Sequence, residues 1–181
     1  MNHWQNILFF FTLLARISDL LTTWLVSPTL KLEANPLARK FRWPFAFLTL
    51  LVAFLAYYTP EMAVAIATAS FLVAGSNASR IAAARALGEE QLFAMVLAHA
   101  RTGKFWPGLL ARIAPVPFYG LLAGFVFWFY PTPTSWGWFI ALGIASYAAA
   151  LLVHYTLSYI RFRRMGGLVE ISSKPPVQSV G

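Results

Sequence analysis

The sequence predicts an all-α protein, a polytopic membrane helical bundle with five transmembrane helices and one cytoplasmic interfacial helix. Hydrophobic residues make up 59% of its 181 residues and charged residues only 11%, whereas a soluble domain has about 45–50% apolar and about 25% charged residues. Five segments each hold the roughly 20 mostly apolar residues that a membrane-spanning helix needs. The basic residues fall in alternate connecting segments, which is typical of a multi-pass membrane protein.

The first predicted span covers about residues 4–26. Its start carries no Lys or Arg, and Arg16 and Asp19 interrupt its apolar run. A signal peptide has a basic start and an uninterrupted apolar core. We therefore interpret this segment as a retained span.

Four further spans follow, and each is expected to be helical because backbone in lipid must satisfy its own hydrogen bonds. Pro60 ends the second span. In the fifth span the small residues Gly143 and Ala150 share one face, which is expected to let that helix approach a neighbour closely. The four predicted spans cover about residues 41–59, 61–83, 109–130 and 136–160.

Residues 88–104 are predicted to form a separate helix at the cytoplasmic interface. Gly88 interrupts the preceding run, and Glu89 and Glu90 then place negative charge in a first helical turn, where the helix dipole favours it. Apolar residues recur on one face of this segment, as in a helix half-immersed in the interface. A helix that docks a partner protein is the alternative interpretation.

All spans are expected to belong to one integral-membrane domain, residues 1–165. Residues 166–181 are rich in Gly, Ser, Pro and Val, a composition that predicts a flexible C-terminal tail. The chain contains no cysteine, which excludes disulfides and thiolate metal sites.

The positions of Lys and Arg predict the orientation in the membrane. Of the 14 basic residues, 12 lie in the segments 28–43 and 76–108 or after the fifth span. The start of the chain and the turns near residue 60 and at residues 131–135 have none. Cytoplasmic loops carry the excess of Lys and Arg, so the sequence predicts a prokaryotic cytoplasmic (inner) membrane protein with its N-terminus outside and its C-terminus in the cytoplasm.

Several polar side chains fall within or just beyond the spans, where lipid makes them costly. Arg16 and Asp19 each cost roughly 2.5–3.5 kcal/mol at a helix centre, and their spacing of three residues lets them pair. With Thr12 and Thr23 they form a stripe that is expected to face the protein interior. The whole candidate cluster, which the topology gathers in the inner half of the bundle, is Arg16, Asp19, Thr22, Thr23, Glu33, Asn35, Asn77, Arg80, Arg112 and His154.

This cluster has two interpretations, a cytoplasm-facing polar site or a set of structural ion pairs that fix helix register. Asp19, Glu33 and His154 offer three metal ligands, but no ligand spacing requires a metal, and we predict neither a metal nor a cofactor. Arg80 and Arg112 are suited to the phosphate of an anionic lipid headgroup. No residue is assigned a catalytic role.

The stretch Asp19-Leu20-Leu21-Thr22-Thr23, followed by Glu33-Ala34-Asn35-Pro36, resembles the signature of a family of small, uncharacterised prokaryotic multi-pass membrane proteins. That signature is Asp-x-x-Thr-Thr at the end of a first span and Glu-x-Asn-Pro just after it. The resemblance implies a polytopic inner-membrane protein. It also implies that Asp19, Thr23, Glu33 and Asn35 act as one constellation, and it supplies no reaction.

The leading functional hypothesis is a non-catalytic subunit, scaffold or assembly factor of a larger membrane complex, because five Phe-rich spans fill such a role without any chemistry. The alternative is a small membrane enzyme or carrier that binds a lipid-like or small anionic substrate at the cytoplasm-facing polar site. The expected partners are the lipid bilayer, a larger membrane complex and an anionic lipid headgroup. Nucleic acid is not expected, because no separate soluble domain exists to bind it.

Overall fold

The computed structural model of the chain describes residues 3–32, 36–102 and 104–173, and it contains helices and no strand within these ranges. The all-α fold that the sequence predicts is therefore confirmed. The helices, with η1 a 3₁₀-helix, are α1 (His3–Val26), α2 (Pro36–Leu48), η1 (Thr49–Phe54), α3 (Leu55–Tyr58), α4 (Pro60–Thr102), α5 (Phe105–Ile113), α6 (Pro115–Phe129) and α7 (Trp136–Ser173).

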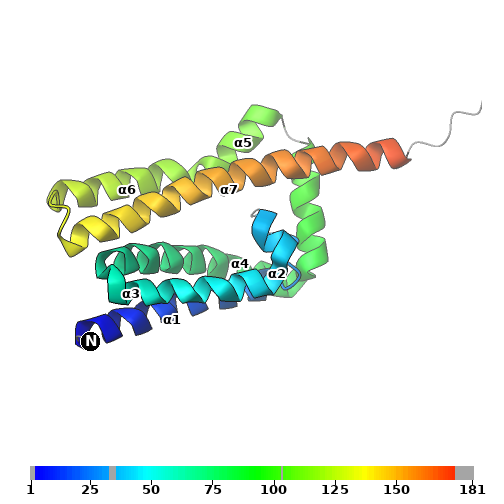
Figure 1. Cartoon of the computed structure of the whole chain (residues 1–181). Coiled ribbons are helices and arrows are strands. Elements are labelled where there is room, and N and C mark those ends of the chain that lie inside the picture. Colours follow the sequence, from blue (N-terminus) through cyan, green and yellow to red (C-terminus); the bar gives the residue numbers. More distant parts are fainter. Residues whose placement is uncertain (1–2, 33–35, 103, 174–181) are drawn as a thin grey trace, which may run out of the picture.

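Within the part of the chain that the structure describes, five helical stretches are long and apolar enough to cross a membrane, as many as the sequence predicts. Large apolar side chains cover the outside of the bundle, as they do where a helix faces lipid; Leu121 is 76% exposed and Trp128 is 83% exposed. The chain starts at one end of the bundle, and α7 runs out at the opposite end (Figure 1). An odd number of crossings requires this arrangement.

The helix α4 lies at the centre of the bundle. It packs along α1 on one side and along α7 on the other, α6 pairs with α7, and η1 and α3 pack on α1. In Figure 1 the α6–α7 pair therefore lies beside the group formed by α1, α2, α3 and α4. The contact between α4 and α7 joins these two groups of helices.

A glycine makes the contact between α4 and α7 possible. A Cβ atom placed on Gly143 would lie 2.5 Å from the backbone oxygen of Ala65 and 2.7 Å from Cβ of Thr68. Real Cβ atoms do not approach other atoms so closely, so only glycine fits here. The expectation that a small residue lets the fifth span approach its neighbour is confirmed at Gly143.

Two of the predicted spans are not single regular helices. The second span changes direction at Arg42, whose backbone has φ 54° and ψ −145°, and then continues as the 3₁₀-helix η1. The fourth span breaks at Ala114 into α5 and α6. Pro115 and Pro117 cause this break, because proline cannot donate the backbone hydrogen bond that would continue α5, whereas it fits the first turn of a new helix.

The separate helix predicted after Gly88 is confirmed. Gly88 has φ 76° and ψ 160°, which no residue of a regular helix adopts, so α4 bends sharply there. The segment that follows, residues 89–102, crosses the end of the bundle and is called the arm below (Figure 1). Phe93 of the arm packs edge-on against Phe162 of α7, with ring centroids 5.6 Å apart. The arm is thus held on α7, and the end of the bundle that it crosses is called the arm end.

We expect the substitution Gly88→Ala to lower the stability of the protein. A positive φ with an extended ψ is accessible almost only to glycine, so a Cβ costs about 1–3 kcal/mol at this position although the surrounding space is open. Thermal unfolding in detergent measures the loss. Gly75→Ala is the matched control on the same helix, since Gly75 is helical and also has open space around it, and there alanine is expected to be neutral or stabilising.

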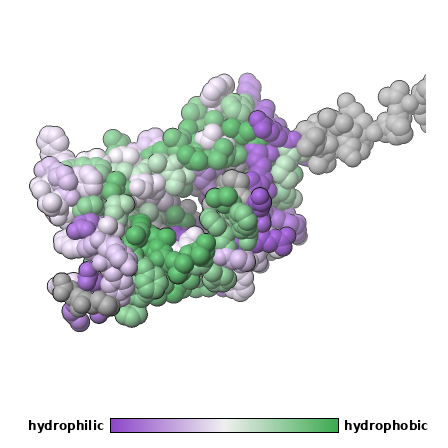
Figure 2. All heavy atoms as spheres, viewed as in Figure 1, coloured by the Kyte–Doolittle hydropathy of each residue, from purple (hydrophilic) through white to green (hydrophobic). Residues whose placement is uncertain are grey.

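The arm end carries the strongly hydrophilic surface of the molecule. Figure 2 shows these side chains along the arm and near the end of α7, while green apolar side chains cover much of the middle. Helix α7 continues to Ser173, beyond residue 165 where the membrane domain was expected to end, so the first part of the expected tail is helical. Residues 174–181 of that tail lie outside the described residues.

Candidate functional site

A cleft of about 370 Å³, lined by both polar and apolar residues, lies between the two groups of helices and is half open to the outside. Its walls come from α1, α2, η1, α4 and α7, and Figure 2 shows the surface hollowed between α2 and the α6–α7 pair. Six of the ten candidate residues line it: Arg16, Asp19, Thr23, Asn77, Arg80 and His154. The structure thus brings these six residues together around one cleft.

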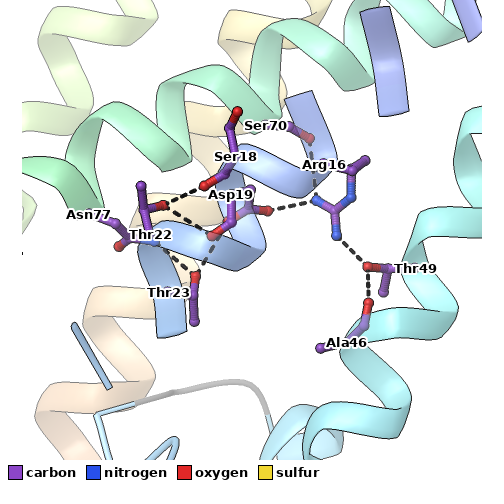
Figure 3. Close-up of polar contacts among 9 residues, drawn as sticks. All are labelled: Arg16, Ser18, Asp19, Thr22, Thr23, Ala46, Thr49, Ser70 and Asn77. Carbon is purple, nitrogen blue, oxygen red and sulfur yellow. Dashed lines mark hydrogen bonds and ion pairs between the residues drawn. The ribbon is translucent and has the colours of Figure 1, made fainter. Parts of the chain in front are cut away.

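An ion pair forms the deep wall of the cleft. The Nη1 atom of Arg16 lies 2.7 Å from Oδ2 of Asp19. The same guanidinium donates to Oγ of Ser70 at 3.3 Å and to Oγ1 of Thr49 at 2.6 Å (Figure 3). Asp19 is buried, and the side chain of Arg16 is 18% exposed. One arginine of the first span thus connects the second and third spans as well.

The carboxylate of Asp19 starts a chain of polar contacts toward the third span. The hydroxyl of Thr23 donates to Oδ1 of Asp19 at 3.5 Å, and Nδ2 of Asn77 donates to the Thr23 hydroxyl at 3.0 Å. Thr22 behaves differently, because its hydroxyl donates to the backbone oxygens of Ser18 and Asp19 in its own helix (Figure 3). Thr22 therefore satisfies its hydrogen bonding locally and does not line the cleft.

The polar stripe on α1 faces the protein interior, as expected. Thr12 is fully buried and donates to the backbone oxygen of Ala63 at 3.3 Å, one turn and more before Arg16. The whole stripe therefore contacts α4. Helical spacing of polar residues in an apolar span was a sound guide to the buried face.

The mouth of the cleft is cationic and aromatic. Arg80 is exposed; its Nη2 atom donates to the hydroxyl of Tyr155 at 2.8 Å, and its guanidinium lies 5.8 Å from the centre of that ring. The ring of His154 lies edge-on to Tyr155, with centroids 5.6 Å apart. On the opposite wall Trp43 donates its indole N–H to the backbone oxygen of Pro28 at 2.9 Å.

Of the four remaining candidate residues, Thr22 and Arg112 do not line the cleft, and the other two lie outside the described residues. Arg112 lies on α5, and its guanidinium is 5.3 Å from the ring centre of Tyr159. It does not line the cleft, because the break at Ala114 separates α5 from the rest of the fourth span. Glu33 and Asn35 lie outside the described residues. Within the described residues, no three His, Asp or Glu side chains gather to hold a metal ion.

Sequence reasoning missed four residues that complete the site, namely Thr49, Ser70, Tyr155 and Trp43. Ser70 and Thr49 are small polar residues inside apolar spans, and that position was a usable signal. Tyr155 and Trp43 resemble the other aromatic residues near span ends, which anchor a helix at the headgroup level. Only the packing of α2 and α7 around the cleft sets these two apart.

A second polar contact closes the arm end beside the cleft. The Glu89 carboxylate, at the start of the arm, accepts hydrogen bonds from the Ser27 hydroxyl and from the backbone N–H groups of Thr29 and Lys31. Burial alone would raise the pKa of Glu89, but these hydrogen bonds outweigh it and hold the pKa below the ordinary value of 4.5. The segment that joins the first span to the second therefore lies at the same end of the bundle as the arm.

We expect Glu89→Gln to weaken this contact at neutral pH by about 1–2 kcal/mol, because charge-assisted hydrogen bonds become neutral ones. A carboxylate with a lowered pKa stabilises the fold above its unfolded pKa, and this contribution disappears as the pH falls through its folded pKa. Thermal unfolding at several pH values should therefore show a difference between wild type and variant that shrinks as the pH falls below 4.5. In Glu90→Gln, which removes only the exposed ion pair with Lys31, the change should be small at every pH.

No protein-family model matches the chain, and neither a curated protein nor a solved structure matches it significantly. The fold and the cleft thus define the class: over the described residues, an all-α bundle with five helices able to cross a membrane and a cleft of mixed polarity near the arm end.

Proposed function

We propose that the protein is an integral protein of the prokaryotic cytoplasmic membrane that binds a small anionic or lipid-like substrate in the cleft, from the cytoplasmic side. The observation that carries the proposal is the half-open cleft itself, with Arg80 and His154 among the residues that line it. A purely structural set of ion pairs needs no open volume beside it. A ligand-binding protein does.

The balance of charge in the cleft favours an anion. Asp19 neutralises Arg16 in the deep wall. Arg80, in contrast, makes no ion pair with any carboxylate whose side chain the structure describes. The Nε–H of Arg16 is buried, and it has no acceptor among those residues. The cleft therefore offers an uncompensated cation at the mouth and a spare donor in its depth.

The size and the apolar part of the cleft favour an amphiphile. A volume of about 370 Å³ lies in the range of small-molecule sites. Trp43, Phe45 and Leu151 contribute apolar surface to the same walls. A molecule with an anionic group and a short apolar portion would satisfy both kinds of lining.

The proposed orientation of the protein in the membrane rests on the positions of its basic residues. The connection after α1 and the arm are in contact through Glu89, and both belong to the segments with the excess of Lys and Arg. By the positive-inside rule this end faces the cytoplasm. The N-terminus then lies outside and the C-terminus inside.

The hypothesis that the protein is a subunit or scaffold stays a prediction, and it leads to a different experimental result from the binding proposal. A subunit of a larger complex should co-purify with other polypeptides in fixed proportion from native membranes. A binding protein or carrier should instead retain a small anionic molecule. Mass spectrometry of the intact protein released from mild detergent detects both.

The variant Ala150→Trp tests the proposal, because Ala150 lines the cleft and a tryptophan would fill part of it. We expect wild-type protein to carry a bound anionic small molecule or lipid, and this variant to have lost it. Leu121→Trp is the matched control, since it adds an indole to the exposed apolar flank. The proposal is wrong if wild type carries no such molecule, or if both tryptophan variants retain it equally.

A further inference from the structure

We infer that the protein binds a phosphate group between Arg80 and Arg112, at a subsite beside the mouth of the cleft. This goes beyond the proposed function, because Arg112 is not part of the cleft lining and the subsite needs only Arg80 from it. The inference rests on two arginines that are each held against a tyrosine of α7.

Two contacts between an arginine and a tyrosine lie one helical turn apart along one face of α7. Tyr155 and Tyr159 are four residues apart, so their side chains lie one above the other on the same helix face. Arg80 reaches Tyr155 from α4, with its guanidinium 5.8 Å from the ring centre. Arg112 reaches Tyr159 from α5, at 5.3 Å. Helices α4 and α5 thus bring two guanidinium groups to neighbouring tyrosines of α7.

The like charges of Arg80 and Arg112 repel each other, because each guanidinium lies against one of two tyrosines that are a single helical turn apart on α7. Among the side chains that the structure describes, the ion pairs are Arg16–Asp19 and Lys31–Glu90, so no carboxylate of that set neutralises Arg80 or Arg112. The repulsion therefore persists in the protein alone. An anion placed between the two guanidinium groups would remove it and gain attraction to both.

The free donors favour a phosphate group. A guanidinium has five N–H donors in a planar fork, and the hydrogen bond to Tyr155 occupies one atom of Arg80. The guanidinium of Arg112 lies 5.3 Å from the centre of the Tyr159 ring, and this cation–π contact uses none of its N–H donors. Two guanidinium groups held against neighbouring tyrosines suit the several oxygens of a phosphate, which arginine recognises in a bidentate manner.

The location fits a phosphate at the membrane surface. Tyr159 is fully buried and belongs to the core that joins α5, α7 and the arm. Figure 2 places the strongly hydrophilic surface at this same arm end. The phosphate could belong to an anionic phospholipid or to a soluble compound, and the two sources are separated by experiment.

The test measures binding to the full-length protein in an uncharged detergent by its thermal stabilisation. The probes are dioctanoyl phosphatidylglycerol, dioctanoyl phosphatidylcholine and inorganic phosphate. We expect the anionic lipid, the inorganic phosphate or both to stabilise wild type more than phosphatidylcholine does. Arg112→Gln and Arg80→Gln should each weaken that binding roughly 10- to 100-fold, as for the loss of a hydrogen bond to a charged group.

Controls separate a local effect from a general loss of charge. Arg85→Gln removes a charge from an exposed position of α4 and should leave the affinity within about twofold of wild type. Arg112→Lys keeps the charge but loses the fork, so it should restore the binding only in part. Stabilisation by phosphatidylglycerol alone assigns a lipid headgroup, and equal stabilisation by inorganic phosphate assigns a soluble source.

Unchanged affinity in both Arg80→Gln and Arg112→Gln would overturn the inference, as would equal stabilisation of wild type by phosphatidylcholine and phosphatidylglycerol with none by inorganic phosphate. The failure of the proposed function can be distinguished from the failure of the phosphate subsite. If Ala150→Trp binds the probes as wild type does while the arginine variants do not, the phosphate subsite stands without the cleft. If only Ala150→Trp loses binding, the cleft stands without the subsite.

Discussion

Replacing Asp19 with alanine is expected to destabilise the protein by about 3–5 kcal/mol, because it leaves the guanidinium of Arg16 without a counter-charge in the interior. The two groups are 2.7 Å apart, and Asp19 is buried. The hydroxyls of Ser70 and Thr49 would still contact Arg16, but neutral groups do not replace the carboxylate. Unfolding of the purified protein in mixed micelles measures the loss.

The double variant Arg16→Met, Asp19→Leu separates the loss of the pair from the loss of one partner. Apolar residues of similar volume in place of a buried ion pair are often neutral or stabilising. We therefore expect the double variant to recover most of the stability that Asp19→Ala loses. A double variant as unstable as Asp19→Ala would show that Arg16 and Asp19 do not act as a pair.

The second large effect is expected for Gly143→Leu, which should separate α4 from α7. Even a Cβ atom at this position meets the backbone oxygen of Ala65 at 2.5 Å, and a backbone atom cannot move aside as a flexible side chain can. Overpacking costs about 1–3 kcal/mol in an ordinary core, and here it acts on the contact that joins the two groups of helices. We expect a loss at or above that range in thermal unfolding.

Gly124→Leu is the matched control for this substitution. Gly124 lies on α6 and has open space around it, so leucine there should fold with little change. Gly143→Ala should fall between the two, because it adds the offending Cβ but nothing beyond it. Equal stability of Gly143→Leu and Gly124→Leu would contradict the close approach of α4 and α7.

The parts of this protein that the sequence predicts well are those governed by hydropathy and helical spacing. The five spans follow from apolar length, and the buried face of α1 follows from the positions of Thr12, Arg16, Asp19 and Thr23. The bend at Gly88 is also readable, because charged residues follow a glycine at the end of an apolar run. In each case the local sequence carries the physical cause.

The breaks within spans were harder to predict. Pro115 and Pro117 were visible in the fourth span, but the sequence did not show that α5 would leave the axis of α6 at that point. Arg112 therefore lies on Tyr159 rather than facing Asp19. The 3₁₀-helix from Thr49 to Phe54 has no comparable local signal, because its hydrogen bonds depend on how the second span packs on α1.

The contacts between helices could not be predicted from the sequence either, because they depend on which helices are neighbours. Arg16 bonds to Thr49 and Ser70 because η1 and α4 lie on either side of it. Hydropathy places each helix in the membrane but leaves open which helices are neighbours. Partners such as Tyr155 for Arg80 become visible only when that arrangement is known.

Single cysteines test the central claim, that a water-filled cleft opens toward the cytoplasm, most directly. The natural chain has no cysteine, so a membrane-impermeant maleimide reports only the introduced one, and thiols react when water reaches them. The three variants are Ala150→Cys in the cleft, Thr132→Cys in the turn between α6 and α7, and Leu121→Cys on the lipid-facing flank.

We expect Ala150→Cys to react in inverted membrane vesicles and not in right-side-out cells, and Thr132→Cys to show the opposite pattern. Leu121→Cys should react from neither side. Labelling of Ala150→Cys from neither side, or from the same side as Thr132→Cys, would contradict the account.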